Sequence, residues 1–219
     1  MRPSEVVRRL ARPVLFLALF VWLAVAIGLV RFWILGAILI AFVAYTTSAV
    51  DATLMKERFR PAGPTADRGL LLVIRLSAAA QLIVSLLDIG RYHWSDTVPA
   101  SLRAGAMVAV AVSLALLSRA MTANRFFSSA IRVQSDRGHR VVRDGPYAIV
   151  RHPGYLGMIV VGPAAALALG SWYGLLLALI YSAAIARRVS VEDRFLRGRL
   201  DGYAEYANDV RYRLVPGVW

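Results

Sequence analysis

Long uncharged apolar runs limit what this chain can fold into. Residues 13–30 and 32–50 form uncharged runs of 18 and 19 residues, and only Arg31 separates them. A helix of about 20 apolar residues crosses the hydrocarbon core of a bilayer, where the backbone has to satisfy its own hydrogen bonds. The two runs therefore predict a first pair of membrane helices, joined by a tight turn.

Two further apolar segments follow the polar connector of residues 51–69. Residues 70–90 predict a third span, and residues 99–121 predict a fourth. The third span carries Arg75 and Asp88, and we expect both side chains to reach the membrane interface by snorkelling. Asp88, with a serine one turn before it, also suits hydrogen bonding to a neighbouring helix.

The last apolar run, residues 153–186, is too long for one crossing. As a single helix it would extend roughly 51 Å at 1.5 Å per residue, against about 30 Å of hydrocarbon. Of the 26 Lys and Arg residues, 22 lie in four polar segments, residues 1–12, 51–69, 119–151 and 187–219. Because positive charge marks the cytoplasmic side, both flanks of the run lie there. It therefore predicts two short antiparallel helices that turn near residues 170–172, and one long helix kinked at Pro163 is the alternative.

These runs predict an all-α fold, a polytopic membrane helix bundle of about six spans whose last two form a helical hairpin. We expect a multi-pass protein of the cell (inner) membrane, with both termini and the polar segments cytoplasmic. Residues 1–123 hold the first four spans, and residues 124–219 hold the polar motifs. A hydrophobic content of 58% and a mean hydropathy of +0.59 agree with this class.

The net charge of +13 raises the question of partners. The basic residues flank membrane-like runs, so we expect anionic lipid headgroups as their counter-charge, and no nucleic acid. Cysteine is absent, which excludes disulfides, thiolate metal ligands and a cysteine nucleophile. The three histidines are spaced unlike ligands on one helix, so we expect no metal. The sequence also lacks the glycine-rich phosphate and dinucleotide motifs and the serine-hydrolase elbow.

The densest polar chemistry precedes the last apolar run. Residues 138–152 contain a Gly-Pro turn signal and predict irregular backbone. Pro153 suits the first position of a helix. The free amide groups of that helix start, flanked by Arg151 and His152, favour an anion such as a carboxylate or a phosphate. Two glycines in the first turns permit close approach by a ligand or by another helix.

A second polar cluster ends the last apolar run. Arg188 and Glu192 are four residues apart on a helix, so they share a face. They either pair with each other or jointly line a cavity. If residues 153–186 form a hairpin, this cluster returns beside His152 at the cytoplasmic surface, and the two clusters form one site.

Four segments of the sequence resemble one known family. They are HRVVRDGPYAIVRHPGYLG (139–157), EDRFL (192–196), YAEY (203–206) and RLVPG (213–217). They resemble the isoprenylcysteine carboxyl methyltransferase and phospholipid methyltransferase family of integral membrane enzymes. The resemblance covers roughly residues 124–219.

The resemblance implies methyl transfer from S-adenosylmethionine, bound in a cytoplasmic pocket, to a lipid-like acceptor arriving from the bilayer. An isoprenylcysteine carboxylate is the first acceptor it suggests, and a phospholipid amine or a small thiol are the alternatives. The cofactor-binding residues that it implies are Gln134, His139, Arg140, Val141, Val142, Tyr147, His152, Pro153, Gly154, Tyr155 and Glu192. Arg188 falls where the family places an arginine that faces the acceptor, and Asp193 stands where a second Glu is common. If the acceptor must lose a proton, His139 and His152 are the candidate bases.

Two other functions are alternatives to a methyltransferase. A membrane sterol-reductase-like enzyme that uses NADPH has a similar R-H-x-x-Y-x-G stretch and a similar ending to YRLVP (212–216), but its usual Asp is Met158 here. A six-span transporter or scaffold without catalysis is the second alternative. Transporters place ionisable residues in corresponding halves, and no second half mirrors the first in this chain.

Overall fold

A computed structural model describes residues 28, 30–50, 52–59, 61, 63, 65 and 67–219 of the protein. The predicted first span, residues 13–30, lies almost entirely outside this part of the chain. The helices of the described residues are α2 (Val30–Ala49), α3 (Ala52–Phe59), α4 (Arg68–Leu87), η1 (Asp88–Tyr92), α5 (Ala100–Ala123), η2 (Ser135–Arg137), η3 (Gly145–Ala148), α6 (Pro153–Leu169), α7 (Trp172–Arg199) and α8 (Tyr203–Asp209). No strand occurs among the described residues, so the all-α prediction is confirmed for them.

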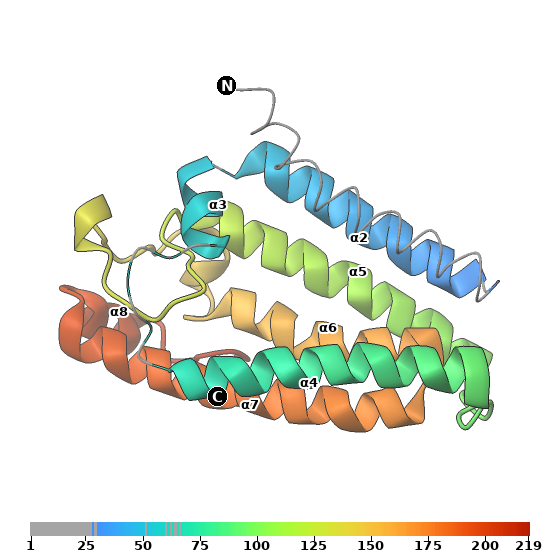
Figure 1. Cartoon of the computed structure of the whole chain (residues 1–219). Coiled ribbons are helices and arrows are strands. Elements are labelled where there is room, and N and C mark those ends of the chain that lie inside the picture. Colours follow the sequence, from blue (N-terminus) through green and yellow to red (C-terminus); the bar gives the residue numbers. More distant parts are fainter. Residues whose placement is uncertain are drawn as a thin grey trace.

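Long helices run side by side along the molecule, and the polar segments gather at one end (Figure 1). Helix α5 packs against α6, α6 against α7, and α4 against α7, while α2 lies along α5. The loop between α5 and α6, together with α3 and α8, covers the end at which α4 begins and α7 ends (Figure 1). Residues of all the polar motifs therefore lie at the same end of the bundle.

Four described helical segments are long and apolar enough to cross a membrane, which identifies a multi-pass membrane protein. They are Val30–Ala49, Arg68–Tyr92, Ala100–Ala123 and Trp172–Arg199. Helix α6 is apolar but has only 17 residues. The prediction of six crossings depends on α6 and on the first apolar run as well, and it stays a prediction.

The last apolar run is divided into two helices. Gly170 ends α6 with a φ of +92°, a left-handed conformation that favours glycine, and its N–H donates to Ala166 O and Leu167 O. Ser171 then caps α7, because its hydroxyl accepts a hydrogen bond from Gly174 N at 2.9 Å. The two helices run back along each other (Figure 1). Pro163 lies inside α6 and does not join the two halves as a kink within one helix.

Helices α5 and α6 approach each other closely where α6 carries glycine. A Cβ atom at Gly157 would lie 2.6 Å from the carbonyl oxygen of Ser113 in α5, and one at Gly154 would lie 3.4 Å from Ala120 Cβ in α5 and 2.5 Å from a ring carbon of Phe127 in the loop that follows. Small residues let membrane helices pack at this range. Of the two roles that the sequence allows for these glycines, helix contact is the one that the structure has at Gly157.

Asp88 lies at the opposite end of the bundle from the polar loop. Its side chain is completely buried, and its Oδ2 accepts hydrogen bonds of 2.5 Å from the hydroxyls of Ser95 and Ser171. The snorkelling expected of Asp88 is therefore wrong, and the alternative of interhelical hydrogen bonding is correct. The bonds attach the end of α4 to the turn between α6 and α7.

Candidate functional site

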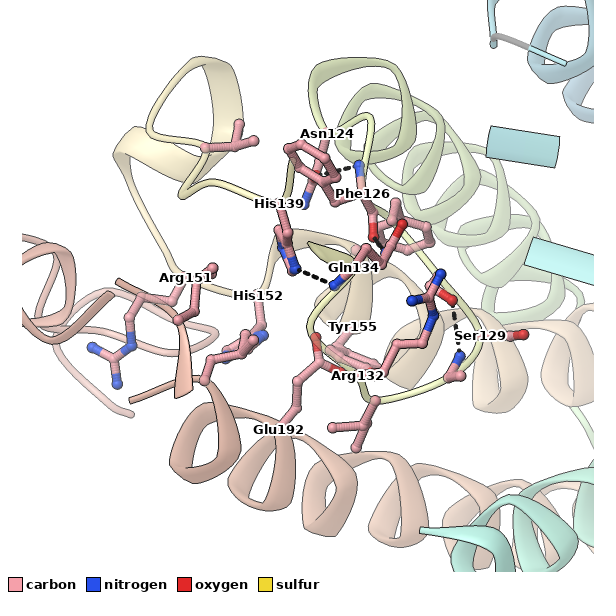
Figure 2. Close-up of a pocket in the computed structure, with 18 of the residues that line it drawn as sticks. Asn124, Phe126, Ser129, Arg132, Gln134, His139, Arg151, His152, Tyr155 and Glu192 are labelled. Atoms are coloured by element: carbon pink, nitrogen blue, oxygen red, sulfur yellow. Dashed lines mark hydrogen bonds between the residues drawn. The ribbon is translucent and has the colours of Figure 1, made fainter. Parts of the chain in front are cut away.

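One cavity at the polar end of the bundle brings the predicted site residues together. Its walls are the start of α6, the end of α7, α8 and the loop from residue 124 to residue 142, as Figure 2 shows. The sequence-predicted ligand-binding residues that line it are Gln134, His139, Arg140, Val141, Val142, Tyr147, His152, Gly154, Tyr155, Arg188 and Glu192. Pro153 begins α6 beside them without lining the cavity. The turn at residues 170 and 171 is what returns α7 to the start of α6.

Tyr155 and Glu192 join the two helices inside the cavity. The Tyr155 hydroxyl donates a hydrogen bond of 2.5 Å to Glu192 Oε2, and the two side chains meet in Figure 2. Glu192 is therefore bonded to α6 and not to Arg188 on its own helix. Of the two predicted arrangements for Arg188 and Glu192, jointly lining a cavity is the one that the structure has.

Arg188 is held from two other segments. Its Nη2 donates to the carbonyl oxygen of Ser129 at 2.6 Å. Its Nε lies 3.1 Å from Asp67 Oδ2, and both side chains are buried. The Nε–H bond is not aligned on that oxygen, so the contact is an ion pair without a formed hydrogen bond. Asp67 thus neutralises Arg188 from the residue that precedes α4.

Gln134 organises the loop before the cavity. Its side-chain Nε2 donates to Phe126 O at 2.7 Å, and its Oε1 accepts from Arg137 Nη1 at 2.5 Å. Its backbone N–H donates to His139 Nδ1 at 3.2 Å. The side-chain amide is fully buried and used within the loop, so it shapes the wall of the cavity.

His139 presents a donor to the cavity. Because Nδ1 accepts from Gln134, the neutral ring carries its hydrogen on Nε2. Burial, reinforced by the nearby charges of Arg132 and Arg137, lowers the pKa of His139 to about 4. The ring is therefore neutral at physiological pH, and its one basic nitrogen is already bonded. This arrangement gives His139 little capacity to act as a general base.

His152 belongs to a buried network centred on Asp193. Its Nε2 lies 3.4 Å from Asp193 Oδ1 and 3.2 Å from the Tyr203 hydroxyl, which itself donates to Asp193 at 3.0 Å. Arg151 Nε at 2.8 Å, Arg213 Nε at 3.0 Å and Arg197 Nε at 3.4 Å also donate to the carboxylate. In the sequence Asp193 is recognisable only as a departure from a Glu pair, and no pattern around it indicates that it is the centre of this network.

The charge of Arg151 is not available to an anion at the start of α6. Its Nη1 donates to the carbonyl oxygens of Val210 at 2.7 Å and Arg211 at 2.8 Å, in addition to its pairing with Asp193. In Figure 2 the side chain points away from Tyr155 and Glu192. The role predicted for Arg151 as a flanking cation is therefore wrong, because a carboxylate and backbone carbonyls already use its guanidinium.

The chain after α8 is hydrogen-bonded to the backbone just before α6. The backbone N–H of Arg151 donates to Tyr212 O at 3.0 Å, and that of His152 donates to Arg213 O at 2.9 Å. These bonds fix the backbone that enters α6. Through these bonds the C-terminal segment RLVPG (213–217) is held against the segment that contains His152.

Two tyrosines close the outer wall of the cavity. The Tyr206 hydroxyl donates to Tyr147 O at 2.7 Å, and the Tyr147 hydroxyl donates to Ala120 O at 3.3 Å. Burial raises the pKa of both phenols, so both stay neutral. The wall contributes apolar surface and fixed hydroxyl groups, and it adds no charge.

The cavity continues toward the membrane-crossing helices. Leu71, Ile74 and Arg75 of α4 line it, together with Met158 of α6. Arg75 is exposed on the surface of α4, as its predicted snorkelling requires. Sequence reasoning did not name the α4 residues as part of the site, because no motif marks them. The cavity therefore combines a polar half at the loop with an apolar half among membrane helices.

Comparison with known proteins finds a similarity over part of the chain. A sequence model of the Isoprenylcysteine carboxyl methyltransferase (ICMT) family matches residues 104–198. A Protein-S-isoprenylcysteine O-methyltransferase of Schizosaccharomyces pombe is 32% identical over 98 residues, which cover 43% of this chain and 42% of that protein. The chain thus matches less than half the length of this relative. The matched residues 104–198 contain the loop, α6 and most of α5 and α7, so over this region the chain is similar to the isoprenylcysteine carboxyl methyltransferase family.

Proposed function

We propose that the protein is a membrane methyltransferase that moves a methyl group from S-adenosylmethionine to a lipid-like acceptor. The observation that carries the proposal is the continuity of one cavity from the polar loop to apolar residues of α4 and α6. A polar donor and a lipid-like acceptor need such a cavity if they are to meet. The family match supports the same reaction class.

The residues of the polar half fit the methyl donor. Glu192 offers a carboxylate to the amino-acid ammonium group, and the start of α6 at Gly154 favours its carboxylate. His139 offers a ring N–H, and Val141 and Leu196 offer apolar surface. When bound, the donor supplies a methyl group that its sulfonium already activates. The chain then has to align the reactants and exclude water.

The remaining lining fits an acceptor that arrives from the bilayer. Leu71, Ile74 and Met158 provide an apolar path from the membrane helices, and Arg188 faces the cavity as a cation that can orient an acceptor anion. A carboxylate acceptor needs no general base, whereas an amine or a thiol must lose a proton. His139 and His152 are both engaged by protein groups. We therefore favour an isoprenylcysteine-like carboxylate over a phospholipid amine or a small thiol.

We further propose that the polar end of the bundle faces the cytoplasm and that the chain crosses the cell membrane six times. The support is the charge distribution, because 18 of the 26 Lys and Arg residues lie in residues 51–69, 119–151 and 187–219, and the described parts of these segments lie at that end (Figure 1). Anionic lipid headgroups are the partner that this basic surface suits. Cysteine-scanning accessibility from each side of the membrane tests the orientation.

A binding experiment followed by a transfer experiment tests the function. The purified protein in detergent is titrated calorimetrically with S-adenosylhomocysteine and with NADPH, and is then incubated with methyl-labelled S-adenosylmethionine and farnesylated N-acetylcysteine. We expect binding of S-adenosylhomocysteine and a labelled, base-labile methyl ester. Binding of NADPH alone would contradict the proposal and favour a reductase. Exposed Arg119 supplies a matched control, since Arg119→Gln removes one arginine outside the cavity.

A further inference from the structure

Arg58 of α3 lines the cavity and has no acidic partner among the residues that the structure describes. Its guanidinium carbon lies 4.8 Å from the centroid of the Phe127 ring. Burial lowers the pKa of Arg58, which means that its charge is poorly compensated. Within the described residues, no carboxylate forms an ion pair with it. A half-buried cation left in this state costs free energy that a cation–π contact offsets only in part.

The other arginines of the cavity are satisfied or exposed. Arg188 pairs with Asp67, Arg132 with Glu57 and Asp136, and Arg151 with Asp193. Arg75 and Arg140 are exposed to the surroundings of the protein. Arg58 is therefore the cation whose position is best explained by a negative group that the cavity receives from outside.

Arg58 lies close to Arg188 and to Tyr155. Its further electrostatic neighbours are Tyr181 and Tyr147. On α7, Arg188 precedes Glu192 by one turn and Tyr181 precedes it by three, toward the apolar part of the helix. The guanidinium is thus placed beside the acceptor half of the cavity.

We infer that Arg58 is a specificity-determining residue that binds the anionic group of the acceptor beside Arg188 and so selects anionic over neutral acceptors. The inference rests on the proposed function and deepens it. Arg188 alone is already neutralised by Asp67, so the second guanidinium supplies the positive charge that an entering anion meets. Arginine binds carboxylates through two parallel N–H groups.

The test compares binding of an acceptor carboxylic acid with binding of the matching neutral carboxamide. Farnesylated N-acetylcysteine and its carboxamide are titrated into the protein saturated with S-adenosylhomocysteine, in discs of phosphatidylcholine. We expect the acid to bind about 10-fold more tightly than the amide. Arg58→Gln should remove this preference without changing the affinity for S-adenosylhomocysteine. Arg58→Lys should restore part of it, because it keeps the charge and loses the planar fork. Arg119→Gln should keep both affinities.

Several outcomes would overturn the inference while leaving the methyltransferase proposal intact. One is that Arg58→Gln binds the acid in preference to the amide as strongly as wild type does. The others are that this variant loses acid and amide binding equally, or that it loses S-adenosylhomocysteine binding. The inference would also be overturned if the wild-type preference for the acid over the amide disappeared in phosphatidylglycerol discs, because the site would then bind a lipid phosphate. If the wild-type protein bound S-adenosylhomocysteine but not the acid, the proposed acceptor would fail as well. If it bound neither, the proposed function itself would fail.

Discussion

The Tyr155 hydroxyl donates a 2.5 Å hydrogen bond to Glu192, and this bond joins the start of α6 to the last third of α7. The two residues are distant in sequence and meet because the chain reverses at Gly170 and Ser171. The cavity that contains this bond is lined both by polar residues of the loop and by apolar residues of α4 and α6. Under the proposed function, donor and acceptor would meet near this bond.

Replacing Glu192 should weaken donor binding. Glu192→Gln keeps the shape of the side chain but removes the negative charge, so we expect about 10- to 100-fold weaker binding of S-adenosylhomocysteine in calorimetric titration. Tyr155→Phe, which leaves the charge in place, should cost less. Glu205→Gln on the exposed surface of α8 is the control and should bind normally. Normal binding by Glu192→Gln would show that the donor does not contact this carboxylate.

Replacing Asp193 should destabilise the protein. Asp193→Asn leaves Arg151 and Arg213 buried or half-buried without their anion, and losing one partner of a buried ion pair costs about 3–5 kcal/mol. Thermal unfolding in detergent measures this loss. Asp209→Asn breaks an exposed pair with Arg143, for which we expect almost no change. Equal melting temperatures for the two variants would contradict a structural role for Asp193.

His139 should make stability depend on pH. The folded protein holds the pKa of His139 at about 4, whereas an unfolded histidine titrates near 6.5. The unfolded chain therefore binds the proton first, so this stability is fully present above about pH 6.5 and is lost as the pH falls toward 4. Because the ring is partly exposed, we expect on the order of 1 kcal/mol. Unfolding of wild type and His139→Gln, measured from pH 7.5 to 4.5, should differ in slope below pH 6.5, and parallel curves would refute the assignment.

Most of the residues that the sequence predicted for the site line one cavity, and part of that prediction rests on local chemistry. The Gly-Pro turn, Pro153 at a helix start and the spacing of Arg188 and Glu192 are local patterns. The charge distribution predicted the reversal between α6 and α7, which brings these residues together. Each inference needed only neighbouring residues or the balance of charge across a membrane.

The sequence did not predict contacts that depend on helix packing over long separations. Nothing near Asp67 marks it as the partner of Arg188, and nothing in α3 marks Arg58 as a cavity residue. Asp88 was expected at the membrane interface because hydropathy cannot distinguish an interfacial carboxylate from one that buried hydroxyls satisfy. Where a side chain is satisfied by another segment, the pattern around it contains no signal.

A methyl group added at Gly157 should separate α5 from α6. Its Cβ would lie 2.6 Å from the Ser113 carbonyl oxygen, which is backbone and cannot rotate away. We expect Gly157→Ala to cost about 1–3 kcal/mol of stability. Gly105→Ala in α5 is the matched control, because its Cβ would meet open space and alanine favours the helix by roughly 0.5–1 kcal/mol. Thermal unfolding of both variants should therefore shift in opposite directions. A shift in the same direction would mean that α5 and α6 are not in contact at Gly157 in the membrane protein.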